Sequence, residues 1–275
     1  MRVLILGGTG FIGRAIASLL PSRTVFNRGT DPSMPGLVGD RDTGDYAALR
    51  TGSWDAVVDC SGYFPWQVSQ AIDALGTRAG RYLFLSSHAV FDGGSSSLRP
   101  ALWDAAPPLT NDTYGPSKVA CERVVLDRFG DRATIVRPCK VAGPGDNQEG
   151  LTHWVREAAR GGEIEVPGSV SQPVQLVDSR DLAAFVVRLL TDDRGGAWTA
   201  AGDPTTLGSL IETCASVAGT TVTLKPVAFR RAPLVRPPPV WPTLNRDPAP
   251  ARAAGLPVTP LATTIADILA EIRSQ

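Results

Sequence analysis

The sequence predicts an α/β fold in which parallel strands alternate with helices. Its opening apolar run, Arg2–Leu6, leads directly into glycines at positions 7, 10 and 13. Further apolar runs of strand length alternate with helix-like segments, which is the pattern of βαβ units. Polar residues suited to catalysis follow the ends of these runs, where ligands of open parallel sheets gather. We therefore expect a Rossmann-type doubly wound parallel sheet with a small C-terminal substrate-binding α/β lobe.

The segment Gly7-Gly-Thr-Gly-Phe-Ile-Gly13 has the features of a dinucleotide-binding turn. It follows a strand and opens a helix that we expect from Arg14 to Leu20. Gly7 and Gly10 permit turn conformations and let a pyrophosphate lie against the main chain, while Gly13 lets the helix pack closely. Free N–H groups at the helix start would hold the phosphate charge. The alternative, a purely structural glycine-rich turn, is disfavoured by this strand–turn–helix context.

The second strand, Arg23–Asn27, is followed by Arg28 and Gly29. An acidic residue at this strand end would bond the 2′-hydroxyl of the adenosine ribose of NAD, and none is present. The guanidinium of Arg28 can instead pair with a 2′-phosphate. NADP is therefore the preferred cofactor and NAD the alternative, and Arg28 as a solvated turn residue is the competing interpretation.

Three more strands complete the predicted sheet before the catalytic segment. We expect them at Leu37–Asp40, Trp54–Cys60 and Arg81–Leu85, with a helix from about Pro65 to Arg78. Ser61 and Gly62 follow the fourth strand at the sheet end where the cofactor would pass.

Two groups of polar residues follow the fifth strand and suggest catalysis. Ser86 and Ser87 come at its end, and Tyr114 and Lys118 stand four residues apart, which puts them on one face of a helix. A tyrosine, with a reference pKa near 10, becomes a base at neutral pH only if an adjacent ammonium lowers that value. Ser87 would orient the reacting oxygen and Lys118 would also hold the nicotinamide ribose. A Tyr-x-x-x-Lys spacing also arises by chance on solvated helix faces.

These motifs together resemble the extended short-chain dehydrogenase/reductase superfamily and, within it, the NAD-dependent epimerase/dehydratase family. The resemblance continues through Val136-Arg-Pro138, Gly143-Pro-Gly-Asp146 and Pro173–Leu182 and covers roughly the first 190 residues. It implies Ser87, Tyr114 and Lys118 as the catalytic triad, Asp40 near the adenine, and Gln175 and Arg180 near the substrate cleft. It also suggests a homodimer.

Some positions depart from the family pattern. Dehydratases of the family carry an Asp-Glu pair where this chain has His88 and Ala89, so dehydration is not expected. Val90-Phe-Asp-Gly93 is similar to the dTDP-4-dehydrorhamnose reductase version, which favours net reduction or oxidation. Lys140 replaces an Asn near the substrate phosphate, so it could bind a phosphate or carboxylate or be a surface lysine. His88 could assist proton transfer or simply line the cleft.

The second half of the chain predicts a smaller lobe. We expect a Rossmann NAD(P)-binding domain over 1–145, which includes a sixth strand at Ala133–Arg137, and mainly a substrate-binding lobe over 146–275, interleaved and without a linker. The lobe should contain helices at 151–160, 179–190, 207–219 and 261–272 and strands at 163–166, 174–177, 197–200 and 221–225. Trp154 lies on the first of these helices, where it could line the cleft or belong to the core. The proline-crowded segment 231–260 should be irregular.

Composition narrows the class of protein. The formal net charge is zero, which gives no basic footprint for nucleic acid or anionic membranes. The four cysteines are scattered without Cys-x-x-Cys pairs, and there are only two histidines, so neither disulfides nor a metal site are expected. No apolar stretch reaches the length of a membrane span and the first strand leaves no room for a signal peptide, so a cytoplasmic location is expected.

The function expected from the sequence is an NAD(P)-dependent oxidoreductase acting on a sugar nucleotide or a small natural-product carbonyl compound or polyol, with Tyr114 as acid/base. A sugar-nucleotide epimerase is the nearest alternative, and a non-catalytic NADP-binding regulatory or RNA-associated protein is an alternative of another class. The expected cofactor contacts are Gly7, Thr9, Gly10, Phe11, Ile12, Asn27, Arg28, Asp40, Cys60, Ser61, Gly62, Tyr114 and Lys118. The expected substrate contacts are Ser87, His88, Lys140, Trp154, Gln175 and Arg180.

Overall fold

The computed structural model describes residues 1–104 and 106–274, and the chain divides into two units. Unit 1 comprises residues 1–92, 96–138 and 183–200, and unit 2 comprises residues 93–95, 139–182 and 201–275. The boundary near Pro138 differs from the expected one at residue 145, and residues 183–200 return to unit 1.

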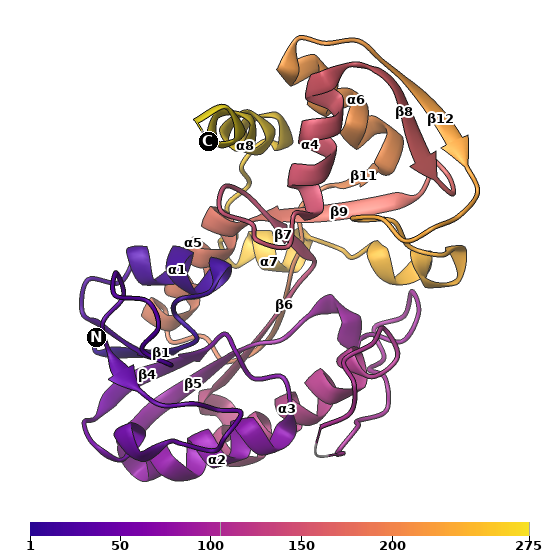
Figure 1. Ribbon diagram of the computed structural model, residues 1–275. Helices are drawn as coiled ribbons and strands as arrows, with labels where there is room; N and C mark the ends of the chain where they lie inside the picture. Colours follow the sequence, from indigo (N-terminus) through magenta and orange to yellow (C-terminus); the bar gives the residue numbers. More distant parts are fainter. Residues whose placement is uncertain (105, 275) are drawn as a thin grey trace. The chain divides into compact units, whose positions relative to one another are not determined.

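Unit 1 is built on a parallel sheet of seven strands within the described residues. Its order is β10-β6-β5-β4-β1-β2-β3, and every neighbouring pair is parallel. Figure 1 labels β1, β4, β5 and β6 of this sheet. The strands are β1 (Val3–Leu6), β2 (Arg23–Asn27), β3 (Leu37–Val38), β4 (Trp54–Asp59), β5 (Ala79–Leu85), β6 (Ala133–Pro138) and β10 (Gly196–Ala200). Because β1 lies between β2 and β4, the strand order reverses there, and ligands of such sheets bind beyond the carboxyl ends at that point. The predicted doubly wound α/β fold is confirmed.

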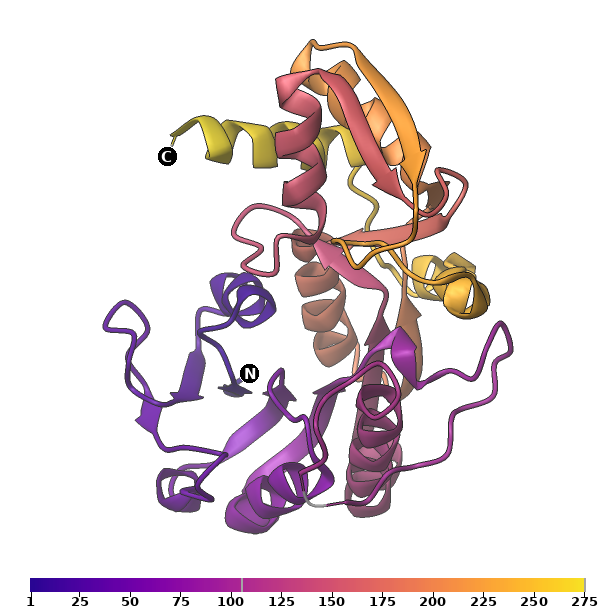
Figure 2. The same ribbon diagram turned by 45° about the vertical axis from the view of Figure 1, so that its right-hand side comes forward.

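Helices cover both faces of this sheet. Helices α2 (Pro65–Leu75) and α3 (Tyr114–Phe129) lie side by side on one face, and α1 (Phe11–Ser18) lies on the other (Figures 1 and 2). Apolar side chains of α2 and α3, such as Val68 and Val125, pack with Leu4, Val57 and Phe84 of the strands. The buried faces of the strands are continuously apolar because helices shield them on both sides.

Two strand predictions need correction. The segment 197–200, expected in the small lobe, forms β10, which pairs in parallel with β6 from Gly196↔Thr134 to Ala200↔Pro138. The third strand ends at Val38 instead of Asp40, since Asp40 turns back to form a bridge with Asp45. In both cases the apolar pattern identifies a strand, but it does not determine which strand it pairs with or at which residue it ends.

Unit 2 holds two small sheets and a group of helices. Strand β9 (Pro173–Asp178) lies between β11 (Pro204–Thr206) and β7 (Lys140–Ala142), and β8 (Gly162–Pro167) pairs in parallel with β12 (Val222–Val227). Helices α4 (Gly150–Arg160), α6 (Leu207–Ala218) and α8 (Leu261–Ser274) pack against one another around an apolar core. Helix α5 (Ser179–Thr191) starts in this unit and ends in unit 1. The proline-rich segment contains a short 3₁₀ helix, η5 (Pro238–Leu244), and α7 (Ala249–Ala253).

Candidate functional site

The glycine turn at the carboxyl end of β1 fits a dinucleotide. Gly7 has φ +81°, a conformation that favours glycine, and its N–H donates to the carbonyl of Phe26 at 3.1 Å. A Cβ at Gly13 would lie 2.3 Å from the Gly7 carbonyl oxygen, so only glycine allows α1 to pack this closely. Gly10 caps α1 without any side-chain hydrogen bond. The first N–H groups of the helix therefore have no side-chain acceptor, which suits a phosphate.

The end of β2 forms a fixed turn that presents Arg28 to solvent. The Asn27 amide donates to the Met34 carbonyl at 3.1 Å and accepts from the Gly29 N–H at 2.6 Å. Its polar atoms therefore hold the loop, and its predicted cofactor contact gains no support. Arg28 is exposed, and no ion pair involves it among the described residues. Asp40 is half-buried and accepts from the Asp42 N–H at 2.9 Å.

Tyr114 and Ser87 meet at the carboxyl end of β5. Ser87 stands two residues after the last residue of that strand and its side chain is hydrogen-bonded to Tyr114. The approach is possible because the next helical residue is Gly115, where a Cβ would lie 2.1 Å from the Ala89 carbonyl oxygen. His88 and Ala89 form a short 3₁₀ turn after Ser87, with the Ser87 hydroxyl accepting from the Ala89 N–H at 3.2 Å. The structure thus brings together two members of the predicted triad.

Lys118 lies one turn further along α3 and is almost fully buried. Its ammonium donates to the carbonyl oxygens of Gly62 and Leu85, both at 2.7 Å, and lies 4.1 Å from the centre of the Phe84 ring. It is also 5.7 Å from the centre of the Tyr63 ring, which itself stands 6.5 Å from that of Tyr114. An ammonium has three donors, and backbone carbonyls of two strand ends use two of them.

The pKa of Tyr114 moves opposite to the sequence expectation. Burial raises it to about 12 and the neighbouring Tyr63 acts in the same direction, while the Ser87 hydrogen bond acts to lower it. Burial also lowers the pKa of Lys118. The shared helix face predicted from the spacing is present, but loss of solvent outweighs any help from the ammonium in the protein alone.

A buried ion pair between Glu122 of α3 and Arg137 of β6 was not predicted from the sequence. Glu122, on α3, accepts from Arg137 Nε at 2.9 Å, from Arg137 Nη2 at 2.6 Å and from the Ser86 hydroxyl at 2.5 Å. Ser117 donates to the Tyr63 carbonyl at 2.7 Å. The available signal was spacing, since Glu122 follows Lys118 by four residues and therefore shares its helix face.

Three predicted substrate contacts have structural roles in unit 2. Trp154 is 1% exposed, belongs to the core and donates its indole N–H to the Pro233 carbonyl at 2.8 Å. The Gln175 amide donates to the Gly202 and Arg246 carbonyls and accepts from the Arg246 N–H. Arg180 forms ion pairs with Asp178 and Asp267. Trp154 is therefore a core residue and does not line a substrate site. The polar side-chain atoms of Gln175 and Arg180 already bond to other residues of the protein.

Lys140 lies in unit 2 beside a second cation. Its ammonium donates to the Gln148 side-chain oxygen at 2.7 Å, and its chain crosses Gly150, where a Cβ would lie 2.6 Å from Lys140 Cε. Burial lowers the pKa of Lys140, nearby Arg236 lowers it further and Asp146 opposes this. The backbone of Arg236 is fixed, because its N–H donates to Gln172 at 2.8 Å and its carbonyl accepts from Trp241 at 2.8 Å.

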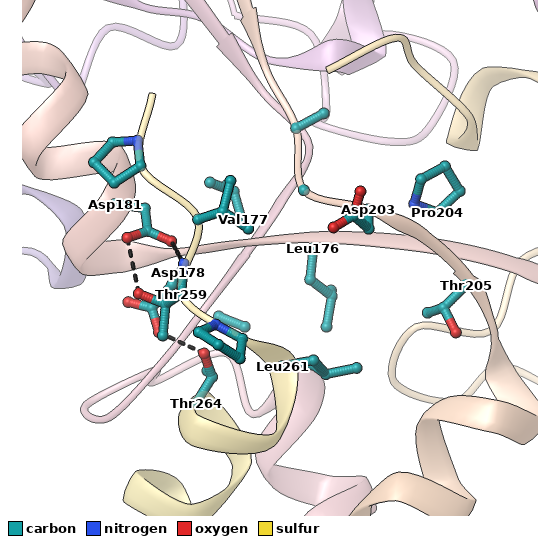
Figure 3. Close-up of a pocket in the computed structure, with 16 residues that line it drawn as sticks. Leu176, Val177, Asp178, Asp181, Asp203, Pro204, Thr205, Thr259, Leu261 and Thr264 are labelled. Atoms are coloured by element: carbon teal, nitrogen blue, oxygen red, sulfur yellow. Dashed lines mark hydrogen bonds between the residues drawn. The ribbon is translucent and has the colours of Figure 1, made fainter. Parts of the chain in front are cut away.

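A cavity of about 290 Å³ in unit 2 has none of the predicted site residues in its lining. Its walls come from β9, from residues 201–205 and from the segment 257–261 that leads into α8 (Figure 3). Asp181 accepts from the N–H and hydroxyl of Thr259 at 2.6 and 2.8 Å, and Asp178 accepts from Thr264 at 2.6 Å. These bonds tie the segment before α8 to β9 and α5, which is a structural role.

Three features define a Rossmann-type dinucleotide-binding protein: the strand order, the glycine turn at the switch point, and the Ser–Tyr–Lys group at the end of β5. The family model of the NAD dependent epimerase/dehydratase family matches residues 53–201, so the chain belongs to that family. The resemblance inferred from the motifs and the dependence on a nicotinamide dinucleotide are both confirmed. Among the described residues there is no cluster that could hold a metal ion and no helix long and apolar enough to span a membrane.

Known proteins resemble this chain in sequence and in fold. The chain is 27% identical over 251 residues to the chloroplast stem-loop binding protein of 41 kDa b from Arabidopsis thaliana, covering 79% of this chain and 63% of that protein. It is 28% identical over 181 residues to a 3-beta-hydroxysteroid dehydrogenase from Mycolicibacterium neoaurum, covering 53% of this chain and 49% of that protein. The chain thus spans less than two thirds of both relatives. The structure of RMD from Pseudomonas aeruginosa complexed with NADPH shares the fold, with a TM-score of 0.73 and 20% sequence identity. The match covers 100% of this chain and 99% of that one.

Proposed function

We propose that the protein is an NAD(P)-dependent oxidoreductase that reduces a ketone to an alcohol with Tyr114 as the proton donor. The observation that carries the proposal is the hydrogen bond between Ser87 and Tyr114 at the end of β5, with Lys118 one helical turn away. A bound reduced nicotinamide would supply hydride to the carbonyl carbon. Ser87 would hold the carbonyl oxygen and Tyr114 would protonate it, which completes the alcohol.

The protonation state of Tyr114 in the protein alone is the one that a proton donor needs. Because burial raises its pKa to about 12, the hydroxyl is neutral at pH 7 and ready to donate its proton. Alcohol oxidation needs the phenolate instead, and we expect that direction to be favoured only at high pH.

The position of Arg28 supports NADP over NAD. It is exposed at the end of β2, on a turn that Asn27 holds, and no carboxylate pairs with it in the described part of the chain. Its guanidinium is therefore available to a 2′-phosphate. The solved RMD relative contains NADPH.

Lys140 and Arg236 support a substrate with an anionic group, such as the phosphates of a sugar nucleotide. Both are partly buried, and their side chains donate to the neutral oxygens of Gln148 and Val235. An anion between like charges relieves their repulsion, whereas a neutral natural-product ketone leaves it in place. We therefore place a sugar nucleotide ahead of a neutral carbonyl compound.

An epimerase remains the nearest alternative, because the same triad serves both reactions and the matching family includes epimerases. An epimerase retains its dinucleotide and returns the hydride to the opposite face of the substrate. Dinucleotide that copurifies with the protein and substrate isomerisation without net change in nicotinamide absorbance would favour it.

A nucleic-acid-binding role is the alternative of another class. The 27% identical relative is named a stem-loop binding protein, which favours this possibility. The zero net charge and the retained Tyr114 and Lys118 argue against it. This role would be established by two results together: an RNA stem-loop binds the native protein and Tyr114→Phe with equal affinity, and the native protein binds no dinucleotide.

The test is a reductase assay on purified protein. Oxidation of NADPH is followed with 4-keto sugar nucleotides and with neutral ketones, comparing the native chain with Tyr114→Phe. We expect turnover in the native chain and a loss of about a hundredfold or more in the variant, with NADPH affinity retained. Lys225→Met removes an exposed lysine that pairs with Glu163 outside the site, and this variant should keep the native activity. Equal rates in native protein and Tyr114→Phe would refute the proposal.

A further inference from the structure

A buried ion pair joins the loop after β3 to the end of β4 beside the dinucleotide turn. Arg41 is 7% exposed and Asp59, the last residue of β4, is fully buried. Arg41 Nη1 and Nη2 donate to the two carboxylate oxygens at 2.5 and 3.0 Å, which is the bidentate arrangement. The mutual charges lower the pKa of Asp59 and raise that of Arg41. Each charge is thus balanced by the other and is not available to a phosphate.

Both members of this pair hold Ser61. The Asp59 carboxylate accepts from the Ser61 N–H at 3.0 Å, and Arg41 Nη1 donates to the Ser61 hydroxyl at 3.1 Å. Ser61 in turn lies against the glycine turn, since a Cβ at Gly7 would come 2.6 Å from Ser61 Cβ and 2.7 Å from its Oγ. The contact falls where the strand order reverses between β1 and β4, at the point where ligands of such sheets bind.

The same pair also places the residue that contacts Lys118. Asp59 Oδ2 would lie 3.1 Å from a Cβ at Gly62, so the carboxylate packs against the Cα of that glycine. The Gly62 carbonyl accepts from the Lys118 ammonium at 2.7 Å. The segment Cys60–Gly62 therefore touches the glycine turn on one side and the catalytic lysine on the other, with the ion pair behind it.

Stability alone gives a weak reason for this pair. Burying two charges costs desolvation that their attraction offsets only in part, and apolar replacements of both are often neutral or stabilising. Arg41 Nε is buried with no hydrogen-bond partner in the described part of the chain, which adds to the cost. Tyr82 and Tyr46 complete the group: Tyr82 donates to Asp59 at 2.7 Å, and Tyr46, which donates to the Gln67 carbonyl at 3.0 Å, lies near the Arg41 charge.

We infer that Arg41 and Asp59 are positioning residues for the dinucleotide: by holding Ser61 against Gly7 and Gly62 against Lys118, they set the shape of the surface that receives it. The inference rests on the dinucleotide site proposed above. Neither residue contacts the dinucleotide in this scheme, because both act through the segment Cys60–Gly62.

A double-substitution cycle separates positioning from stability. Arg41→Leu, Asp59→Leu and the double variant are compared with the native chain for free energy of unfolding in urea and for NADPH affinity by fluorescence titration. Each single variant leaves a buried charge unpaired and should lose both stability and affinity. The double variant should regain stability but bind NADPH about tenfold more weakly than the native chain, as expected for a lost hydrogen-bonded support.

Two further variants keep the test decisive if a single variant does not fold. Thr134→Val removes a buried hydrogen bond to the Arg194 carbonyl elsewhere in the same unit, so it should reduce stability without changing NADPH affinity. Arg41→Lys keeps the positive charge but loses the bidentate fork. Compared with Arg41→Leu, it should regain more of the native stability than of the native NADPH affinity.

The outcomes are distinct. A double variant with native affinity would overturn the inference, as would single variants that bind NADPH normally. A native chain that binds neither NADPH nor NADH would instead refute the proposed site itself, and the inference with it.

Discussion

The ammonium of Lys118 donates a hydrogen bond to the carbonyl oxygen of Leu85 at 2.7 Å, and Leu85 is the last residue of β5. A second bond of the same length reaches Gly62, which follows β4. One side chain on α3 thereby fixes two neighbouring strand ends, and Ser87 follows one of them. The residue expected to serve the cofactor also determines the local shape of the protein.

Replacing Lys118 with methionine should therefore affect folding as well as catalysis. The variant leaves two buried carbonyl oxygens without a donor, which should lower the free energy of unfolding by about 2 kcal/mol or more. Urea denaturation measures this, and Lys225→Met, which removes an exposed lysine paired with Glu163, is the control that should leave stability unchanged. Equal stabilities of the two variants would contradict the buried role of Lys118.

The glycines of the turn should separate packing from binding. A Cβ at Gly13 would meet backbone atoms at 2.3 and 2.8 Å, whereas a Cβ at Gly10 would have its nearest contact at 3.6 Å. Gly13→Ala should thus cost about 1–3 kcal/mol of stability, the range for overpacking. Gly10→Ala should fold normally and weaken dinucleotide binding, because its methyl group would face the phosphate. Thermal unfolding and NADPH titration of both variants decide this, and normal NADPH binding by Gly10→Ala would contradict the phosphate contact.

Arg28 should control the choice between the two dinucleotides. Arg28→Ala should weaken NADPH binding by roughly tenfold to a hundredfold, the value of a charged hydrogen bond, and leave NADH binding unchanged. Arg23→Ala, which removes an exposed arginine at the start of the same strand, serves as control. If NADPH affinity survives the loss of Arg28, the 2′-phosphate contact lies elsewhere.

Alkaline conditions should destabilise the protein through its buried thiols. Burial raises the pKa of Cys121, Cys139 and Cys214 from 9.0 to about 12. The folded thiols therefore keep their protons at pH values where unfolded thiols lose them, so their contribution is complete below pH 9 and is lost as the pH rises through about 12. Urea unfolding at several pH values should show a falling free energy across this window. A constant free energy there would contradict the burial of these thiols.

Sequence patterns were sufficient for most of unit 1 because its signals are local. The apolar run before Gly7, the glycine spacing, and the interval between Tyr114 and Lys118 each report the geometry of a single strand, turn or helix. Parallel sheets of this kind then admit few strand orders, so the fold class follows from the succession of elements.

Residues whose role depends on distant partners escaped prediction. Trp154 has the same helical spacing as a cleft residue, and only the packing of α4 with α6 and α8 puts it in the core. Arg41 and Asp59 are separated by 18 residues and give no joint signal in the sequence. The pKa of Tyr114 likewise depends on how deeply α3 is buried, which spacing cannot reveal.

Because β10 returns to the sheet of unit 1, that sheet depends on residues far along the chain, both during synthesis and when unit 1 is expressed by itself. Residues 196–200 pair with β6, so a nascent chain can complete this sheet only after Ala200 has left the ribosome. A fragment ending at Pro138 would leave the edge of β6 open, and an open apolar strand edge invites aggregation. Expression of the nucleotide-binding half by itself therefore calls for a chain in which 139–182 is replaced by a short linker, rather than for a simple truncation.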